Sequence, residues 1–232
     1  MTNHSTKTSQ IFYARVAGFL YMIIIITGVL TGTFVDSVLI VQGNNEVTAN
    51  NILANDLLFR VGIVGNLLLY AGVVMLSWAL YIVLKEVNKN LALLAMLLRS
   101  GEAILGAATV LISFIILHLL DGNVYSSLNN CGQLQTFVGI FLNVRTAGLD
   151  IVLLFVGLGG TIFCYLFFKS LYVPGILAIW GMFTYLSMIV LSCISILFPD
   201  HPEILEVIFY SFGGLFELIF GFWLLYKGVK IQ

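Results

Sequence analysis

Six long apolar runs recur along this chain of 232 residues, and they constrain its fold more than any other feature. Each run comes close to or exceeds the roughly 20 residues that an α-helix needs to cross a bilayer. Backbone groups in lipid must satisfy their own hydrogen bonds, so runs of this length fold as helices. The sequence therefore predicts an all-α fold, a polytopic membrane helix bundle with six transmembrane helices.

We predict a single membrane domain over residues 1–232. The polar stretch after the first run carries Ile and Leu at near-helical spacing, which predicts an amphipathic helix at the membrane interface over about residues 48–59. The links after residues 84 and 168 are short enough to require tight hairpins. The predicted spans cover about residues 16–35, 61–84, 91–118, 149–168, 174–198 and 204–226.

Composition excludes several classes of protein. Sixty percent of the residues are hydrophobic and nine percent are charged, whereas soluble domains hold roughly 25% charged residues. A net charge of -1 with scattered Lys and Arg argues against a nucleic-acid partner. The three cysteines form no CxxC pair, so we expect no structural disulfide. The expected partners are membrane lipids and a small hydrophobic ligand, and the sequence does not indicate an oligomeric state.

The sequence carries no motif of a known catalytic or metal centre. It contains no HExxH, no GxSxG and no P-loop. His4 and His201 fall on opposite sides of the predicted membrane, so they cannot form a pair that holds zinc or haem. We therefore assign no catalytic residue, no metal ligand and no cofactor.

The distribution of basic residues predicts the orientation of the chain. If the N-terminus is cytoplasmic, the outer segments hold only Arg60 and Arg145. Loops rich in Lys and Arg stay on the cytoplasmic side, so we predict that both termini are cytoplasmic. The cytoplasmic segments then hold Lys7, Arg15, Lys85, Lys89, Lys169, Lys227 and Lys230.

Three ionisable residues fall deep inside the predicted spans. Arg99 and Glu102 share one face of the third span, because residues three apart on a helix are neighbours. At 1.5 Å per residue, Glu102 and Glu217 lie roughly 16 Å and 15 Å from the cytoplasmic edge, close to the midplane. Arg99 is the only base within reach of both carboxylates. We predict an intramembrane charge cluster of Arg99, Glu102 and Glu217 that faces the bundle interior.

This cluster has a structural and a functional interpretation. In the structural one, Arg99 neutralises the acids and holds two helices in register. In the functional one, the cluster binds or moves a ligand, because each charge costs roughly 2.5 to 3.5 kcal/mol at mid-membrane and commonly marks a substrate or proton path. An enzyme centre is a third interpretation.

A second polar group gathers at the predicted outer interface. Charges near lipid headgroups cost little, so headgroup contact or loop pairing is the expected role. One member, the histidine near the end of the third span, could instead line the mouth of a cavity. The group consists of Arg60, His118, Asp121, Arg145 and Asp150.

Glycines and aromatic residues predict further features of the bundle. Gly28 and Gly32 form a GxxxG pattern, which favours a close helix contact within the protein, with a contact between protomers as the alternative. Three glycines in the fourth span, at positions 157, 159 and 160, follow no strand, so they indicate helix packing and not nucleotide binding. Four aromatic residues near the ends of spans are typical of an interface belt: Tyr13, Tyr21, Trp223 and Tyr226.

The segment from Glu102 to Gly106 is similar to the segment from Glu217 to Gly221, at a shift of 115 residues. With three spans in each half, the halves would be inverted repeats, as in many secondary transporters. The first and fourth spans do not align at this shift, so the sequence leaves the repeat open.

Four segments place polar residues in unusual apolar contexts: residues 14–21, 51–60, 98–103 and 217–229. In these segments the chain resembles the bacterial membrane proteins grouped as domain-of-unknown-function family 4386, and the resemblance extends over nearly the whole chain. It implies a multi-spanning protein of the bacterial cytoplasmic (plasma) membrane. It implies no activity, substrate or catalytic residue.

We interpret the chain as a protein that binds or transports a small apolar or amphiphilic ligand within its helix bundle. A transporter should have a cavity that reaches one side of the membrane and meets Glu102. The alternatives are a membrane enzyme acting on lipid, with a nucleophile or metal beside a carboxylate at headgroup depth, and an accessory subunit with a packed core and no cavity.

Overall fold

The computed structural model describes residues 2–120 and 131–230, and every element in this part of the chain is helical. Helix α1 (Thr2–Thr31) continues through a π-helical turn, η1 (Gly32–Asp36), into the short helix α2 (Ser37–Leu39). Helix α3 (Asn45–Ala54) precedes α4 (Asp56–Leu84) and α5 (Lys89–Leu119). The chain ends with α7 (Cys131–Ser170), α8 (Gly175–Leu197) and α9 (Glu203–Lys227).

Six helical segments are long and apolar enough to cross a membrane. This finding confirms the predicted all-α membrane bundle with six spans. The segments are Thr8–Leu39, Asp56–Leu84, Lys89–Leu119, Leu134–Ser170, Gly175–Leu197 and Ile204–Lys227.

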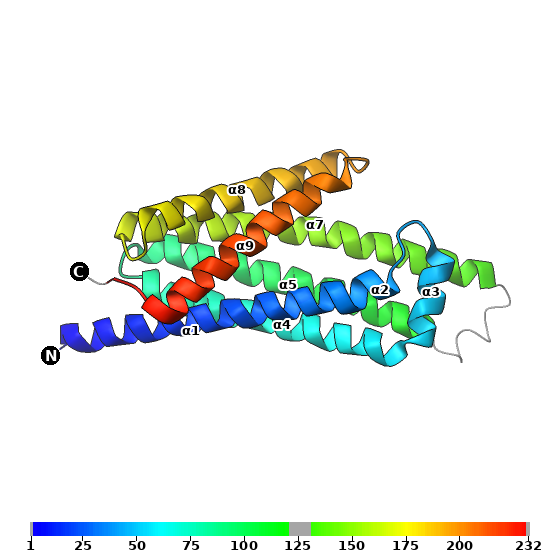
Figure 1. Cartoon of the computed structure of the whole chain (residues 1–232), viewed down its shortest axis with the longest axis horizontal. Helices are drawn as coiled ribbons and strands as arrows, with labels where there is room; N and C mark the ends of the chain where they lie inside the picture. The colour runs from blue at the N-terminus through cyan, green and yellow to red at the C-terminus, as the bar shows by residue number, and fades with distance from the viewer. Residues whose placement is uncertain (1, 121–130, 231–232) are drawn as a thin grey trace.

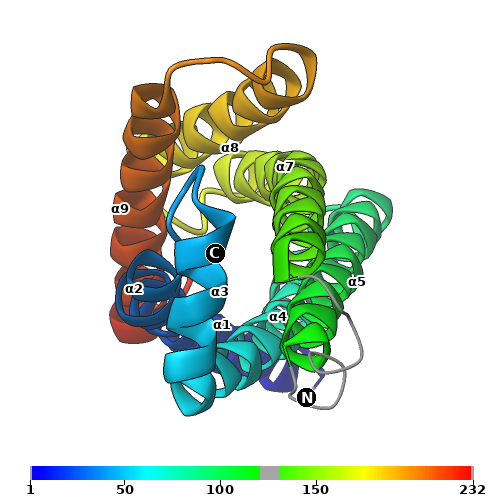
Figure 2. The ribbon, with the colours of Figure 1, turned by 90° about the vertical axis from the view of Figure 1, so that its right-hand side faces the viewer.

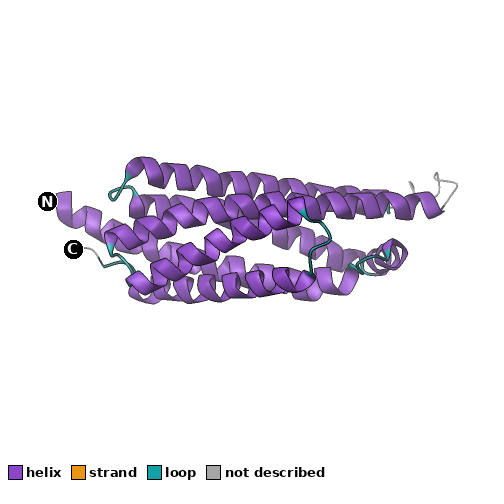
Figure 3. Ribbon diagram, turned by 90° about the horizontal axis from the view of Figure 1, so that it is seen from above, coloured by secondary structure: helices purple, strands orange, loops and turns teal. Residues whose placement is uncertain are grey.

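The six long helices pack as a closed ring. Helix α1 packs on α4, α4 on α5, α5 on α7, α7 on α8 and α8 on α9, which returns to α1. Figure 2 shows this ring end-on, with α3 across the opening. Both chain ends lie at one end of the bundle, together with the α4–α5 and α7–α8 links (Figure 1). We call this the terminal end, and the opposite end, toward which α3 and the α8–α9 link lie, the far end; the links that the structure describes lie toward these two ends (Figure 3).

Two helices differ in extent from the predicted segments. Helix α7 begins near residue 131, whereas the predicted fourth span begins near residue 149, because Arg145 pairs with Asp36 and so does not end the helix. The predicted interfacial helix over residues 48–59 is divided. The Asn44 side chain caps the start of α3 by accepting from the Val47 N–H at 3.0 Å, and the non-helical backbone of Asn55 separates α3 from α4.

At the terminal end, small side chains allow helices to approach closely. A Cβ on Gly18 of α1 would lie 2.6 Å from the Gly221 carbonyl oxygen of α9, so only glycine fits there. A Cβ on Gly28 would meet only the Leu69 side chain, at 3.4 Å, and one on Gly32 would meet nothing within 4 Å, so the GxxxG pattern makes no close helix contact among the described residues. Fully buried alanines complete this core: Ala14, Ala17, Ala79, Ala92 and Ala95.

Candidate functional site

One face of α5 carries a stripe of buried polar side chains. The positions follow helical spacing of three and four residues, so one face presents all of them to the interior of the ring. Polar side chains are costly inside a membrane, so a stripe of this kind has a role beyond apolar packing, either in holding helices in register or in a function. The stripe consists of Arg99, Glu102, Thr109 and Ser113, with Gly106 at the remaining position.

Arg99 and Glu102 form an ion pair near the middle of α5. Arg99 Nη1 lies 2.8 Å from Glu102 Oε2, and the two side chains are 5% and 6% exposed. The contact is not aligned as a hydrogen bond, so both atoms retain unused hydrogen-bonding capacity. Among the described residues, Arg99 has no other ion-pair or hydrogen-bond partner. The pair is buried but incompletely satisfied, which is costly in a low-dielectric interior.

Glycines of α7 make room for this site. A Cβ on Gly159 would lie 2.8 Å from Cγ of Arg99, and one on Gly160 would overlap the ring of Tyr185. A Cβ on Gly157 would lie 2.7 Å from the Tyr185 carbonyl oxygen. The three glycines therefore serve close packing, as their sequence context predicted, and they let Arg99 and Tyr185 enter the interior.

Glu217 lies across the ring and has a different partner. Its Oε1 accepts a hydrogen bond of 2.7 Å from the Tyr185 hydroxyl, which lies 3.4 Å from the hydroxyl of Tyr21. Within the described part of the chain, Glu217 forms no ion pair with Arg99, although the two charges interact electrostatically. The three predicted residues therefore form two neighbouring units, the Arg99–Glu102 pair and a chain that joins Glu217 to two tyrosines.

Sequence reasoning missed the two tyrosines of this chain. Tyr21 was assigned to an interface belt, but its side chain is 3% exposed and lies inside the ring. Its spacing from the buried Ala14 and Ala17 on the same face of α1 is the signal that could have revealed this. No comparable signal distinguishes Tyr185, because its burial depends on the glycine opposite.

The predicted outer polar residues that the structure describes have separate partners and surroundings. Arg145 Nη2 lies 2.9 Å from Asp36 Oδ2 of the π-helical turn, and this pair is half-buried. Arg60 pairs with Asp56 at 2.8 Å on the surface. His118 is exposed beside the Phe114 ring of its own helix. Asp121 lies outside the described residues, and Asp150 lines a cavity described below.

A small polar cavity of about 150 Å³ lies between α1, α4, α5 and α7. Asp36 and Arg145 line it on one side, and Asn66, Tyr70 and Thr109 line it on the other. The Tyr70 ring lies over Gly106, where a Cβ would overlap it. Tyr70 therefore stands between this inner cavity and Glu102, one turn further along α5.

A larger cavity of about 710 Å³ opens at the far end, among the α2–α3 link, α7, α8 and α9. We call it the mouth cavity. Its polar lining includes Asp150, Ser195, His201 and Glu206, and its apolar lining includes Ile40, Val41, Leu142, Ile151, Ile196 and Pro199. On α7, Thr146 and Asp150 line the mouth cavity, whereas their neighbours Arg145 and Leu149 line the inner cavity.

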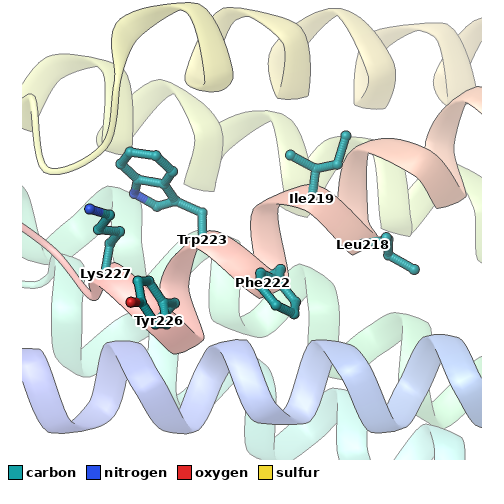
Figure 4. A pocket seen from close by; sticks show the side chains of 6 residues that line it. All are labelled: Leu218, Ile219, Phe222, Trp223, Tyr226 and Lys227. Carbon is teal, nitrogen blue, oxygen red and sulfur yellow. The ribbon is translucent and has the colours of Figure 1, made fainter.

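Two apolar grooves lie on the outer surface of the bundle. One, of about 300 Å³, is lined by residues of α9 from Leu218 to Lys227 (Figure 4). The other, of about 400 Å³, lies on α4 and α5 beside Leu67 and Phe114. Both are almost entirely apolar, and a spanning helix turns such surfaces toward lipid. They offer no set of convergent polar groups for a specific ligand.

The part of the chain that the structure describes holds no group of three or more His, Cys, Asp or Glu residues placed to bind a metal ion. The functional candidates are therefore the ring interior and its mouth. These are the places where polar side chains converge around cavities in an otherwise apolar bundle.

A family model for a domain of unknown function, DUF4386, matches residues 16–228. The chain belongs to the DUF4386 family. The match covers nearly the whole chain and overlaps all six spans from α1 to α9. No curated protein and no solved structure matches the chain. Membership of DUF4386 supplies no activity, so the argument for function depends on the site itself.

Proposed function

We propose that this DUF4386 protein binds a small amphiphilic ligand inside its ring of helices and transports it, with entry from the far end. The observation that carries the proposal is the series of polar features inside the ring. The mouth cavity, the inner cavity, the Arg99–Glu102 pair and Glu217 follow one another toward mid-membrane. Ionisable residues inside a membrane are costly and mark ligand or ion paths.

The inner cavity does not itself reach Glu102, because the Tyr70 ring lies between them. Tyr70 is only half-buried, and its ring packs against the backbone of Gly106, which has no side chain. Thr109 lies roughly 10 Å from Glu102 along the helix axis. Movement of this one side chain would join the inner cavity to the ion pair, so Tyr70 is the gate in the proposal.

The membrane-enzyme alternative has less support. Ser195 Oγ lies 3.5 Å from His201 Nε2, longer than the roughly 2.6 to 3.2 Å expected of a nucleophile and its base. Glu206 contacts the same nitrogen at 3.2 Å, instead of orienting the ring through Nδ1. The accessory-subunit alternative predicted a packed core without a cavity, whereas this bundle has two polar ones. The arrangement favours reversible binding.

A substitution that fills the inner cavity tests the proposal. Asn66→Phe places a large ring in the cavity, and Leu67→Phe places the same ring on the exposed face of α4 as a matched control. Native mass spectrometry of protein taken from membranes in nanodiscs would compare the bound amphiphiles. We expect a bound species in the parent and in Leu67→Phe that Asn66→Phe loses, at similar melting temperatures. Equal retention by both variants, or no bound species in any of them, would refute the proposal.

We also infer that both termini face the cytoplasm of a bacterial cell and that the mouth cavity opens outward. The basic residues at the terminal end support this orientation through the positive-inside rule. Single cysteines at positions 86 and 171 report on the terminal end, and those at 46 and 200 report on the far end. An impermeant thiol reagent applied to whole cells should label only the second pair. Labelling of the first pair alone would invert the orientation and the direction of ligand entry.

A further inference from the structure

The mouth cavity carries an excess of acidic groups in every protonation state of its histidine. Asp150 and Glu206 supply two carboxylates, and His201 is the only basic side chain in its lining. The Nδ1 atom of His201 lies 3.0 Å from the Phe198 carbonyl oxygen, which can only accept, so Nδ1 carries a proton. Nε2 contacts Glu206 Oε1 at 3.2 Å. Even a doubly protonated His201 neutralises only one of the two acids.

The same imbalance continues toward mid-membrane. Each of the two arginines in the interior forms an ion pair with an acid, Arg145 with Asp36 and Arg99 with Glu102. Glu217, by contrast, is paired with a tyrosine hydroxyl and with no base among the described residues. The buried Oε2 of Glu102 also lacks an aligned hydrogen bond. Acceptors and negative charge are therefore in excess from the mouth to the centre of the ring.

A cluster of aromatic rings lies beside the deepest of these acids, Glu217, whose carboxylate accepts a hydrogen bond from one of them, Tyr185. The Tyr185 ring lies 5.8 Å from Phe216, and the Tyr21 ring lies 5.7 Å from Phe220, each in an edge-on arrangement. The two phenylalanines stack on each other at 5.4 Å. Aromatic faces attract cations, most strongly where water is excluded, and a carboxylate beside them adds to that attraction.

From this charge distribution we infer that the ligand is an amphiphilic monovalent cation, such as a protonated or quaternary amine with an apolar body, which binds first in the mouth cavity. The inference rests on the proposed function, because the mouth cavity is the entrance of the proposed path. A volume of about 710 Å³ lies within the roughly 300 to 1,000 Å³ of small-molecule sites. The apolar walls suit the body of such a ligand, and Asp150 and Glu206 suit its charge. An anion would meet repulsion along the path.

A pair of probes with nearly the same shape and opposite charge tests the inference. Tetraphenylphosphonium is a lipophilic cation, and tetraphenylborate is its anionic counterpart. Equilibrium dialysis against the full chain in nanodiscs of zwitterionic lipid, with empty nanodiscs subtracted, should show saturable binding of the cation only. Replacing both acids, Asp150→Asn with Glu206→Gln, should weaken cation binding at least tenfold. Glu86→Gln, at the terminal end and away from the cavities, should leave it unchanged.

The outcomes separate this inference from the proposed function. Saturable binding of tetraphenylborate in place of tetraphenylphosphonium would overturn the cationic class and leave amphiphile binding intact. If the double variant binds the cation as tightly as the parent, Asp150 and Glu206 do not hold it and the inference is overturned, whereas amphiphile binding stands as long as Asn66→Phe still loses its co-purified species. Absence of saturable binding for both probes overturns the inference, and it overturns the proposed function as well if no amphiphile co-purifies with the parent.

Discussion

The two ends of this bundle are built differently. At the terminal end, alanines and Gly18 bring helix backbones into contact, and these alanine side chains are fully buried. At the far end, the mouth and inner cavities open between the same helices, and half-buried charges line them. An apolar cluster around Phe59, Ile116 and Val138 keeps the α3 side of the far end closed. The contrast indicates that the terminal end holds the ring together and that the far end leaves it accessible.

The Arg99–Glu102 pair lies between these two regions, and breaking it should have the largest effect. Arg99→Ala leaves Glu102 buried without a counter-charge, so we expect a loss of about 3 to 5 kcal/mol in unfolding free energy. Thermal or denaturant unfolding in detergent measures it. A melting temperature within error of the parent would show that the interior is hydrated and not dry.

The double variant Arg99→Met with Glu102→Leu distinguishes a structural from a functional role. It removes both charges and keeps apolar bulk, so most of the lost stability should return, because membrane helices pack without charges. If the pair belongs to the ligand path, the restored protein should still lose its co-purified amphiphile. Retention of that species in a stable double variant would assign the pair to helix registration alone.

The same substitution should have opposite effects at the two ends. Gly18→Ala forces a methyl group against the backbone of α9, so we expect a loss of about 1 to 3 kcal/mol. Gly32→Ala meets open space at the first residue of the π-helical turn, inside a continuous helical segment, where alanine is favoured over glycine by roughly 0.5 to 1 kcal/mol. Unfolding in detergent should therefore show a lower stability for the first variant and an equal or higher one for the second. Equal losses at both positions would contradict the packing contrast.

Breaking the half-buried pair of Arg145 and Asp36 near the inner cavity should have an intermediate effect on stability. Arg145→Met removes the partner of Asp36, whose side chain is about one third exposed, so water compensates for part of the loss. We expect about 1 to 2 kcal/mol, below the value for Arg99. Adding Asp36→Leu should recover stability. A loss as large as that of Arg99→Ala would mean that the inner cavity excludes water.

Sequence reasoning predicted the parts of this molecule that depend on local chemistry. Six apolar runs determine six helices, and three-residue spacing brings Arg99 and Glu102 together on α5. Contacts between helices that are distant in the sequence could not be predicted in the same way. Equal depth suggested that Arg99 would reach Glu217, but depth does not determine how helices are rotated within the ring, and the carboxylate bonds to Tyr185 instead. The mouth cavity likewise depends on how four separate segments meet, which no single stretch of sequence encodes.

Breaking the surface pair of Arg60 and Asp56 should have the smallest effect on stability. This pair has nearly the same geometry as the pair of Arg99 and Glu102 and differs from it in exposure. The two members of each pair lie about one helical turn apart, and the N···O distance is 2.8 Å in both pairs. The side chains of the surface pair are 54% and 49% exposed, against 5% and 6% inside the ring. Water and salt screen exposed charges, so Arg60→Met should cost about 1 kcal/mol or less. Because spacing and distance are nearly the same, the difference in stability loss between Arg60→Met and the matched Arg99→Met measures the effect of burying the pair. Comparable losses for the two variants would show that the interior of the ring is as well solvated as its surface, and the path proposed through it would then be an open aqueous one.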